Sequence, residues 1–61
     1  MTADAIRLRL RVLESRGDVR AFFEKAPGSF VVSIDAGPNQ SVRTGRDMEA
    51  LEAHLRRRVA K

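Results

Sequence analysis

The chain contains no cysteine, tryptophan or tyrosine, and its aromatic residues are three phenylalanines. Without cysteine there is no disulfide and no thiolate metal ligand. A domain of 61 residues buries only about 60% of the surface of its unfolded chain and is marginally stable alone. The fold therefore needs a well-packed core, a partner or a second copy of itself.

Long apolar runs are missing as well. No segment approaches the ~20 apolar residues of a membrane span. The N-terminal residues lack the basic head and apolar run of a signal peptide. We therefore expect one cytoplasmic domain, residues 1–61, that does not engage a membrane.

Basic residues outnumber acidic ones, which gives a formal net charge of +4. Lysine occurs only at Lys25 and Lys61, so the other ten basic residues are arginines. A basic excess favours nucleic acid or an acidic protein surface as partner. Arginine in particular suits bidentate contacts to phosphate or carboxylate. A GC-rich genome produces the same arginine bias with no partner at all.

The N-terminal segment alternates between apolar residues and arginine. The apolar positions are Ile6, Leu8, Leu10 and Val12, and the arginines are Arg7, Arg9 and Arg11. A period of two is typical of a strand with one buried and one solvated face. The alternation therefore predicts a strand over about residues 5–13, with the three arginines on its outer face.

A helix over residues 3–16 is the alternative for the same segment. On a helix, Ile6, Leu10 and Leu13 share one face, whereas Leu8 and Val12 point away from it. The order of the chain then becomes α-β-β-α. The tail "SVRTGRDMEALEAHLRRR" is in that case similar to the hairpin-to-helix part of the small phage head–tail joining proteins. This resemblance covers under half of the chain and implies no residue roles.

The next segment has the spacing of a helix. Val19, Phe22, Phe23 and Ala26 lie at i, i+3, i+4 and i+7 and form one apolar stripe. Pro27 disfavours helical geometry at the residue before it. We therefore expect a helix over residues 19–26 and assign all three phenylalanines to the core.

The second half of the chain has clearer signals. Residues 29–35 alternate as a strand, residues 36–39 have turn chemistry, and residues 40–44 return as an antiparallel strand. Thr44 and Asp47 match the Ser/Thr-x-x-acid capping pattern. A helix from about residue 46 to 59 follows, with the apolar stripe Met48, Leu51, Leu55 and Val59.

These elements predict an α+β fold, a two-layer β-α-β-β-α sandwich. Its three-stranded sheet has both helices on one face, because a crossover connection is right-handed. The first strand lies beside either the second or the third. The outer sheet face then consists of Arg7, Arg9, Arg11, Val31, Ser33, Asp35, Ser41 and Arg43.

The outer sheet face is the predicted binding site. Arginines two residues apart on a strand lie roughly 7 Å from each other, close to the spacing of phosphates along a nucleic acid. We expect a basic, non-enzymatic module that contacts nucleic acid phosphates. The residues assigned to this contact are Arg7, Arg9, Arg11, Arg43, Arg56, Arg57 and Arg58. Base reading is not expected, because no aromatic residue is assigned to this face.

Protein assembly is the second hypothesis. A three-stranded sheet leaves an exposed edge that can pair with another strand. The partner is then a second copy of the chain or an acidic protein surface.

No pattern of catalysis or metal binding is present. His54 is the only histidine, and no serine has a histidine at a motif spacing. The glycines match no phosphate-binding loop. We therefore expect no enzyme activity, no catalytic residue, no metal and no cofactor.

Overall fold

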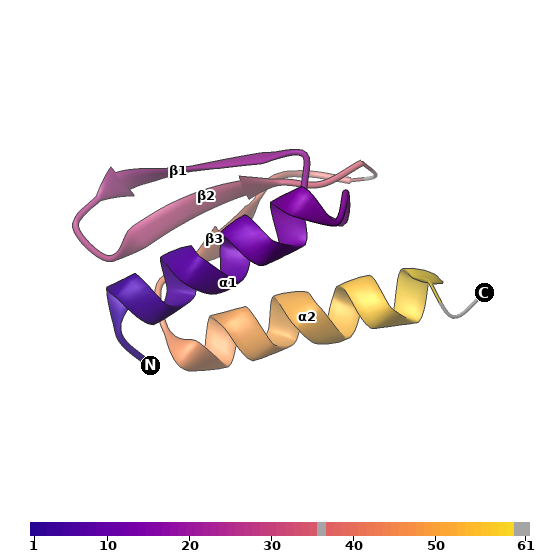
Figure 1. Cartoon of the computed structure of the whole chain (residues 1–61). Helices are drawn as coiled ribbons and strands as arrows, with labels where there is room; N and C mark the ends of the chain where they lie inside the picture. Colours follow the sequence, from indigo (N-terminus) through magenta and orange to yellow (C-terminus); the bar gives the residue numbers. More distant parts are fainter. Residues whose placement is uncertain (36, 60–61) are drawn as a thin grey trace.

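The computed structural model describes residues 1–35 and 37–59, and for residues 58 and 59 it describes the backbone only. The elements are α1 (Ala3–Ser15), β1 (Ala21–Ala26), β2 (Ser29–Ser33), β3 (Gln40–Val42) and α2 (Gly45–Val59). The strands form an antiparallel sheet in the order β1-β2-β3. Both helices lie on the same side of this sheet (Figure 1). The predicted α+β fold with a three-stranded sheet under two helices is confirmed.

The N-terminal segment is a helix, so the strand predicted for residues 5–13 is wrong and the helical alternative is correct. Residues two apart turn by about 200° on an α-helix. The alternating pattern therefore sends Ile6 and Leu10 into the core and Leu8 outward. Thr2 caps the first turn, because its Oγ1 accepts a hydrogen bond from the Ala5 N–H at 3.2 Å.

The segment predicted as a helix over residues 19–26 contains strand β1. Phe22 is half-buried against the core, whereas the other five residues of β1, Phe23 among them, are exposed. Pro27 and Gly28 form the turn to β2, and Gly28 has a φ of 76° that favours glycine. The helical spacing was misleading because aromatic residues also suit a strand. Pairing with β2 makes this segment a strand.

The second half of the chain folds as predicted. β2 and β3 pair antiparallel, and α2 occupies nearly the predicted range. Thr44 Oγ1 accepts a hydrogen bond from the Asp47 N–H at 3.2 Å, and Asp47 Oδ2 accepts one from the Arg43 N–H at 3.0 Å. The predicted cap is confirmed. The predicted turn residue Ala36 and the side chain of Val59 lie outside the described residues.

The two helices run side by side in the same direction (Figure 1). At their beginnings, a Cβ added to Gly45 would lie 3.0 Å from the Met1 Cβ. Further along, Arg9 Nη1 lies 3.3 Å from Glu52 Oε1. The core between the layers consists of Ile6, Leu10, Leu13, Val19, Phe30, Val32, Ile34, Val42, Met48, Leu51 and Leu55. Among the described residues, neither helix has the length and apolar character needed to cross a bilayer.

Candidate interaction surfaces

The three N-terminal arginines lie on α1 and not on the open face of the sheet. Because each successive one is turned by about 200°, Arg9 points away from Arg7 and Arg11, which lie one turn apart. Arg7 reaches β1, Arg9 reaches α2, and Arg11 is exposed to solvent. The evenly spaced outer row that the strand prediction implied does not form.

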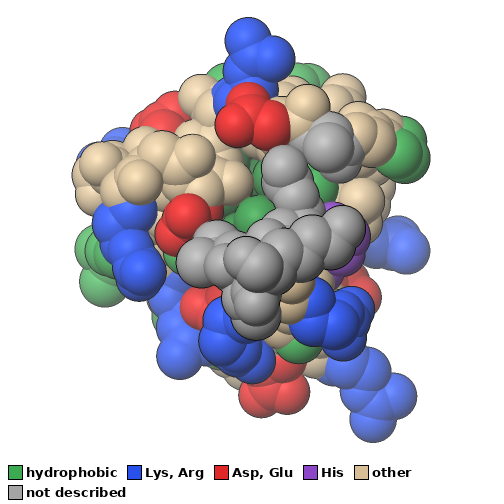
Figure 2. Space-filling model, turned by 90° about the vertical axis from the view of Figure 1, so that its right-hand side faces the viewer, with side chains coloured by type: hydrophobic (Ala, Val, Ile, Leu, Met, Phe, Trp, Pro, Cys, Tyr) green, Lys and Arg blue, Asp and Glu red, His purple; other side chains and the backbone are tan. Residues whose placement is uncertain are grey.

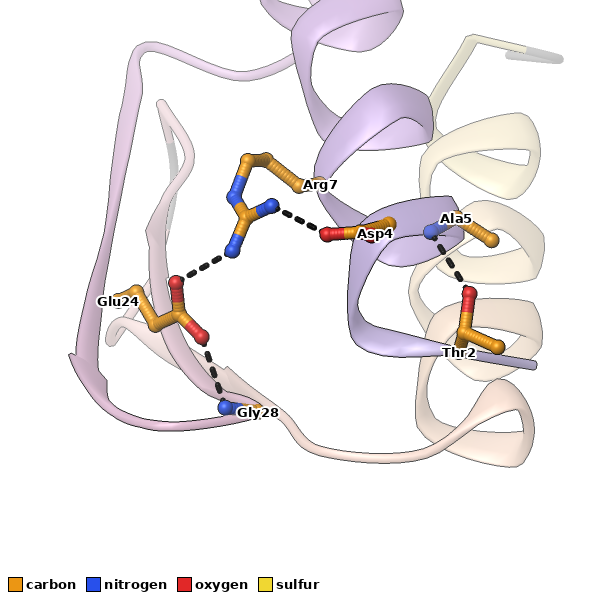
Figure 3. A network of polar contacts seen from close by, with 6 residues as sticks. All are labelled: Thr2, Asp4, Ala5, Arg7, Glu24 and Gly28. Atoms are coloured by element: carbon orange, nitrogen blue, oxygen red, sulfur yellow. Dashed lines mark hydrogen bonds and ion pairs between the residues drawn. The ribbon is translucent and has the colours of Figure 1, made fainter.

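Arg7 connects α1 to the β1–β2 hairpin (Figure 3). Its Nη1 donates to Asp4 Oδ1 at 2.7 Å, and its Nη2 donates to Glu24 Oε1 at 2.6 Å. The Gly28 N–H donates to the other oxygen of Glu24 at 2.7 Å. The hydrogen bond from Gly28, followed by that from Arg7, lowers the pKa of Glu24 below its ordinary value of 4.5. The hydrogen bond to Glu24, followed by that to Asp4, raises the pKa of Arg7. Arg7 therefore has a structural role.

Arg9 lies at the border of a groove between the two helices. The groove has a volume of about 730 Å³, and the nearly buried side chains of Leu13 and Leu55 line it together with Arg16 and Arg56. Two carboxylates share this groove, because Glu52 pairs with Arg9 and Asp18 lies 3.6 Å from Arg16. The groove is thus apolar at its floor and mixed in charge at its rim.

Several exposed arginines have no acidic partner within 4.0 Å among the described residues. They are Arg11, Arg43, Arg46, Arg56 and Arg57. Arg56 and Arg57 lie near the end of α2, where positive charge favours the negative end of the helix dipole. The side chain of Arg58 lies outside the described residues. Viewed from the end where both helices terminate, basic side chains are spread around the molecule with acidic ones between them (Figure 2).

The open face of the sheet carries an apolar pair, Phe23 and Val31, and none of the three N-terminal arginines. Phe23, Val31 and Ser41 are register partners across the three strands, and their neighbours Phe30 and Val32 face the core. The side chain of Phe23 is 59% exposed. Assigning all three phenylalanines to the core was therefore wrong.

The outward side of α1 carries a second apolar feature. Leu8 is 66% exposed and Val12 is 49% exposed, and four residues apart on a helix they lie on the same face. The strand prediction placed both in the core. The signal for their exposure is in the helical alternative, in which they point away from Ile6 and Leu10.

His54 lies beside a small cavity of about 230 Å³ that Ser41 and Asp47 also line. No hydrogen bond of the described residues joins His54 to either of them. Within the same part of the chain, no three histidine, cysteine, aspartate or glutamate side chains gather to hold a metal. This cavity does not carry a catalytic arrangement.

No family model, curated protein or solved structure matches the chain. The interaction surfaces therefore have to be judged from their own chemistry.

Proposed function

We propose that the protein is a non-enzymatic interaction module that assembles through strand β1. The observation that carries this proposal is the exposure of β1: five of its six residues are exposed and Phe22 is half-buried. β1 is also an edge strand, since within the described part of the chain it pairs with β2 alone. An edge strand presents backbone N–H and C=O groups that another strand can pair with.

A second copy of the chain fits this edge. When two β1 strands pair antiparallel with Phe23 opposite its own copy, Ala21 faces Lys25 of the second copy and Phe22 faces Glu24. No like charges oppose each other in this register, which matters because opposed like charges destabilise a sheet. Two neighbouring registers keep the two faces of the sheet distinct. One places Glu24 opposite itself, and the other places Phe22 opposite itself and Phe23 opposite Ala21, so that the two exposed Phe23 side chains no longer meet. The register with Phe23 opposite itself joins Phe23 and Val31 of both copies into one apolar row across the four central strands of the combined sheet.

The absence of cysteine from the chain makes a direct test available. With Phe23→Cys, the two thiols face each other across an antiparallel pair, where Cα atoms lie about 4.5–5.5 Å apart. A disulfide accepts this separation. We expect rapid oxidative cross-linking into a dimer, measured by non-reducing electrophoresis at micromolar protein.

Ala21→Cys is the matched control, because Ala21 is exposed on the same face of the same strand. In the proposed register the two residues at position 21 are offset by four positions, roughly 13 Å along the strand. The two thiols should therefore cross-link slowly. Light scattering on the unmodified chain should give the mass of a dimer at high concentration. Equal cross-linking at both positions, or a monomer at every concentration, would contradict the proposal.

Nucleic acid contact is a second candidate, supported by the five arginines without acidic partners, Arg11, Arg43, Arg46, Arg56 and Arg57. Contact with about four phosphates predicts a slope of roughly −3 to −4 when log affinity is plotted against log salt. Serine at Arg43, Arg56 and Arg57 should reduce this slope without unfolding the protein. Oligonucleotide titrations between 50 and ~200 mM salt test it, and the absence of binding at the lower salt concentration would exclude this candidate.

A further inference from the structure

α1 has two apolar faces, whereas a helix that covers one side of a sheet needs one. Its inner face buries Ile6, Leu10 and Leu13. Its outer face exposes Leu8 and Val12, which together form what we call the outer ridge. The outer ridge contributes nothing to the core of the described fold, so its apolar character requires another explanation.

Three of the six nearest helical neighbours of the outer ridge are arginines. Arg11 lies three residues after Leu8, and Arg9 and Arg16 lie three residues before and four residues after Val12. One acid, Asp4, lies four residues before Leu8, and it is already paired with Arg7 at 2.7 Å. The outer ridge is therefore an aliphatic strip bordered by arginines, of which Arg9 and Arg16 also pair with Glu52 and Asp18.

The groove between the helices continues this surface. Arg9 and Arg16 flank the outer ridge and also line the groove of about 730 Å³ that has Leu13 and Leu55 at its floor. A partner lying along α1 can therefore contact the ridge and the groove together. The side chain of Arg9 is 48% exposed despite its pairing with Glu52, so it remains accessible to a second carboxylate.

Self-association through the outer ridge is unfavourable. Suppose two α1 helices pair antiparallel with Leu8 level with Val12 of the second copy. Arg9 then lies on the same side of the contact as Arg9 of the second copy, offset by only two residues along the helix axis, and the same holds for Arg11. If the helices pair parallel, Arg9 of one copy faces Arg11 of the other. Both arrangements bring like charges together across the contact, which opposes association.

We propose that the outer ridge docks an amphipathic helix from an acidic partner protein. The aliphatic stripe of that helix covers Leu8 and Val12, and its flanking Asp or Glu side chains pair with Arg9, Arg11 and Arg16. This is a known mode of peptide recognition, in which residues at i, i+3 or i+4 anchor a helix in an apolar site. The surface is separate from the β1 edge, so the inference does not rest on self-assembly.

A displayed library of helical peptides tests the proposal. The peptides carry a constant Leu/Ile stripe, and their flanking positions are randomised between Glu and Lys. Selection on the wild-type chain should enrich Glu at the flanks. The double variant Leu8→Gln and Val12→Gln should bind the selected peptides at least about tenfold more weakly, because the buried apolar anchors carry most of the binding energy. Its melting curve should match the wild type, since both positions are exposed.

Ala50→Gln is the matched control, because Ala50 is exposed on the neighbouring helix α2, and it should bind the selected peptides like the wild type. Phe23→Ser should also leave peptide binding intact while it weakens β1 pairing. Enrichment of Lys, failure to enrich any peptide, or equal binding by the double variant would each overturn the proposal. Binding of a DNA oligonucleotide that the double variant loses, with no acidic peptide enriched, would assign the ridge to nucleic acid instead.

Discussion

The two helices are neighbours of similar length, yet they present different outer surfaces. Each begins at a threonine cap, and among the described side chains each buries three apolar ones against the same sheet. On its outward side α2 shows Arg46, Ala50 and Arg57, whereas α1 shows Leu8 and Val12. A single buried stripe is enough to hold α2 in place. The second apolar face of α1 is not needed to hold the helix on the sheet, and this difference motivates the proposal that it docks a partner.

The largest difference in stability is expected between substitutions on the inner face and on the outer face of α1. Leu10 is 0% exposed and Leu8 is 66% exposed. Leu10→Ala should lower the free energy of unfolding by about 2–5 kcal/mol, because it removes buried methyl groups and leaves a cavity. Leu8→Ala should change it by less than about 0.5 kcal/mol. Urea denaturation at neutral pH measures both, and similar losses would show that α1 does not have a dispensable outer face.

A smaller loss of stability is expected when the threonine caps at the beginnings of the two helices are removed. Thr44→Ala should cost about 1 kcal/mol, because it leaves the Asp47 N–H without its acceptor. Thr2→Ala should cost less, since the acid in the first turn of α1, Asp4, pairs with Arg7 and does not reinforce the cap as Asp47 does in α2. Thermal unfolding measures the difference. Thr44→Ser keeps the oxygen and should restore most of the loss; an equal loss with serine would argue against the cap.

The smallest effect on stability is expected from the ion pair between Arg7 of α1 and Glu24 of β1. The pKa of Glu24 is lower in the folded chain than its ordinary value of 4.5. The ionised carboxylate therefore contributes its full stabilisation to the folded state above pH 4.5. This stabilisation is lost as the pH falls through the lowered folded pKa. Glu24→Gln should therefore be less stable than wild type at pH 7, by less than the loss of a cap, and the two should converge in acid.

Urea denaturation at pH 7 and at successively lower pH measures this convergence. Glu49→Gln is the control, because Glu49 is exposed on α2 and makes no ion pair among the described residues. Its difference from wild type should not follow the same pH dependence. A constant difference between Glu24→Gln and wild type at every pH would contradict the role of the ionised carboxylate.

The second half of the fold was predictable from local signals. The turn residues and the Thr44–Asp47 pattern each favour one structure, and the apolar spacing of α2 agrees with them. In the first half the signals conflict. The alternation around Ile6 suits a strand and the spacing around Phe22 suits a helix, yet the structure has the reverse.

The candidate surfaces were predictable to a smaller extent. The exposed edge and the basic excess follow from strand number and composition, but the segment that forms the edge strand β1 was predicted to be a helix. Phe23, Leu8 and Val12 were all assigned to the core, because period and spacing cannot identify which apolar residues remain uncovered. The helical alternative contained the correct positions of Leu8 and Val12.

The sequence by itself determined the α+β class, the β2–β3 hairpin and helix α2, because these depend on contacts close along the chain. Only the tertiary structure decided that residues 3–15 form a helix and that residues 21–26 form a strand. Each of these segments has a pattern compatible with either state. The choice depends on pairing β1 with β2 and on packing α1 beside α2, which are contacts between segments distant in sequence.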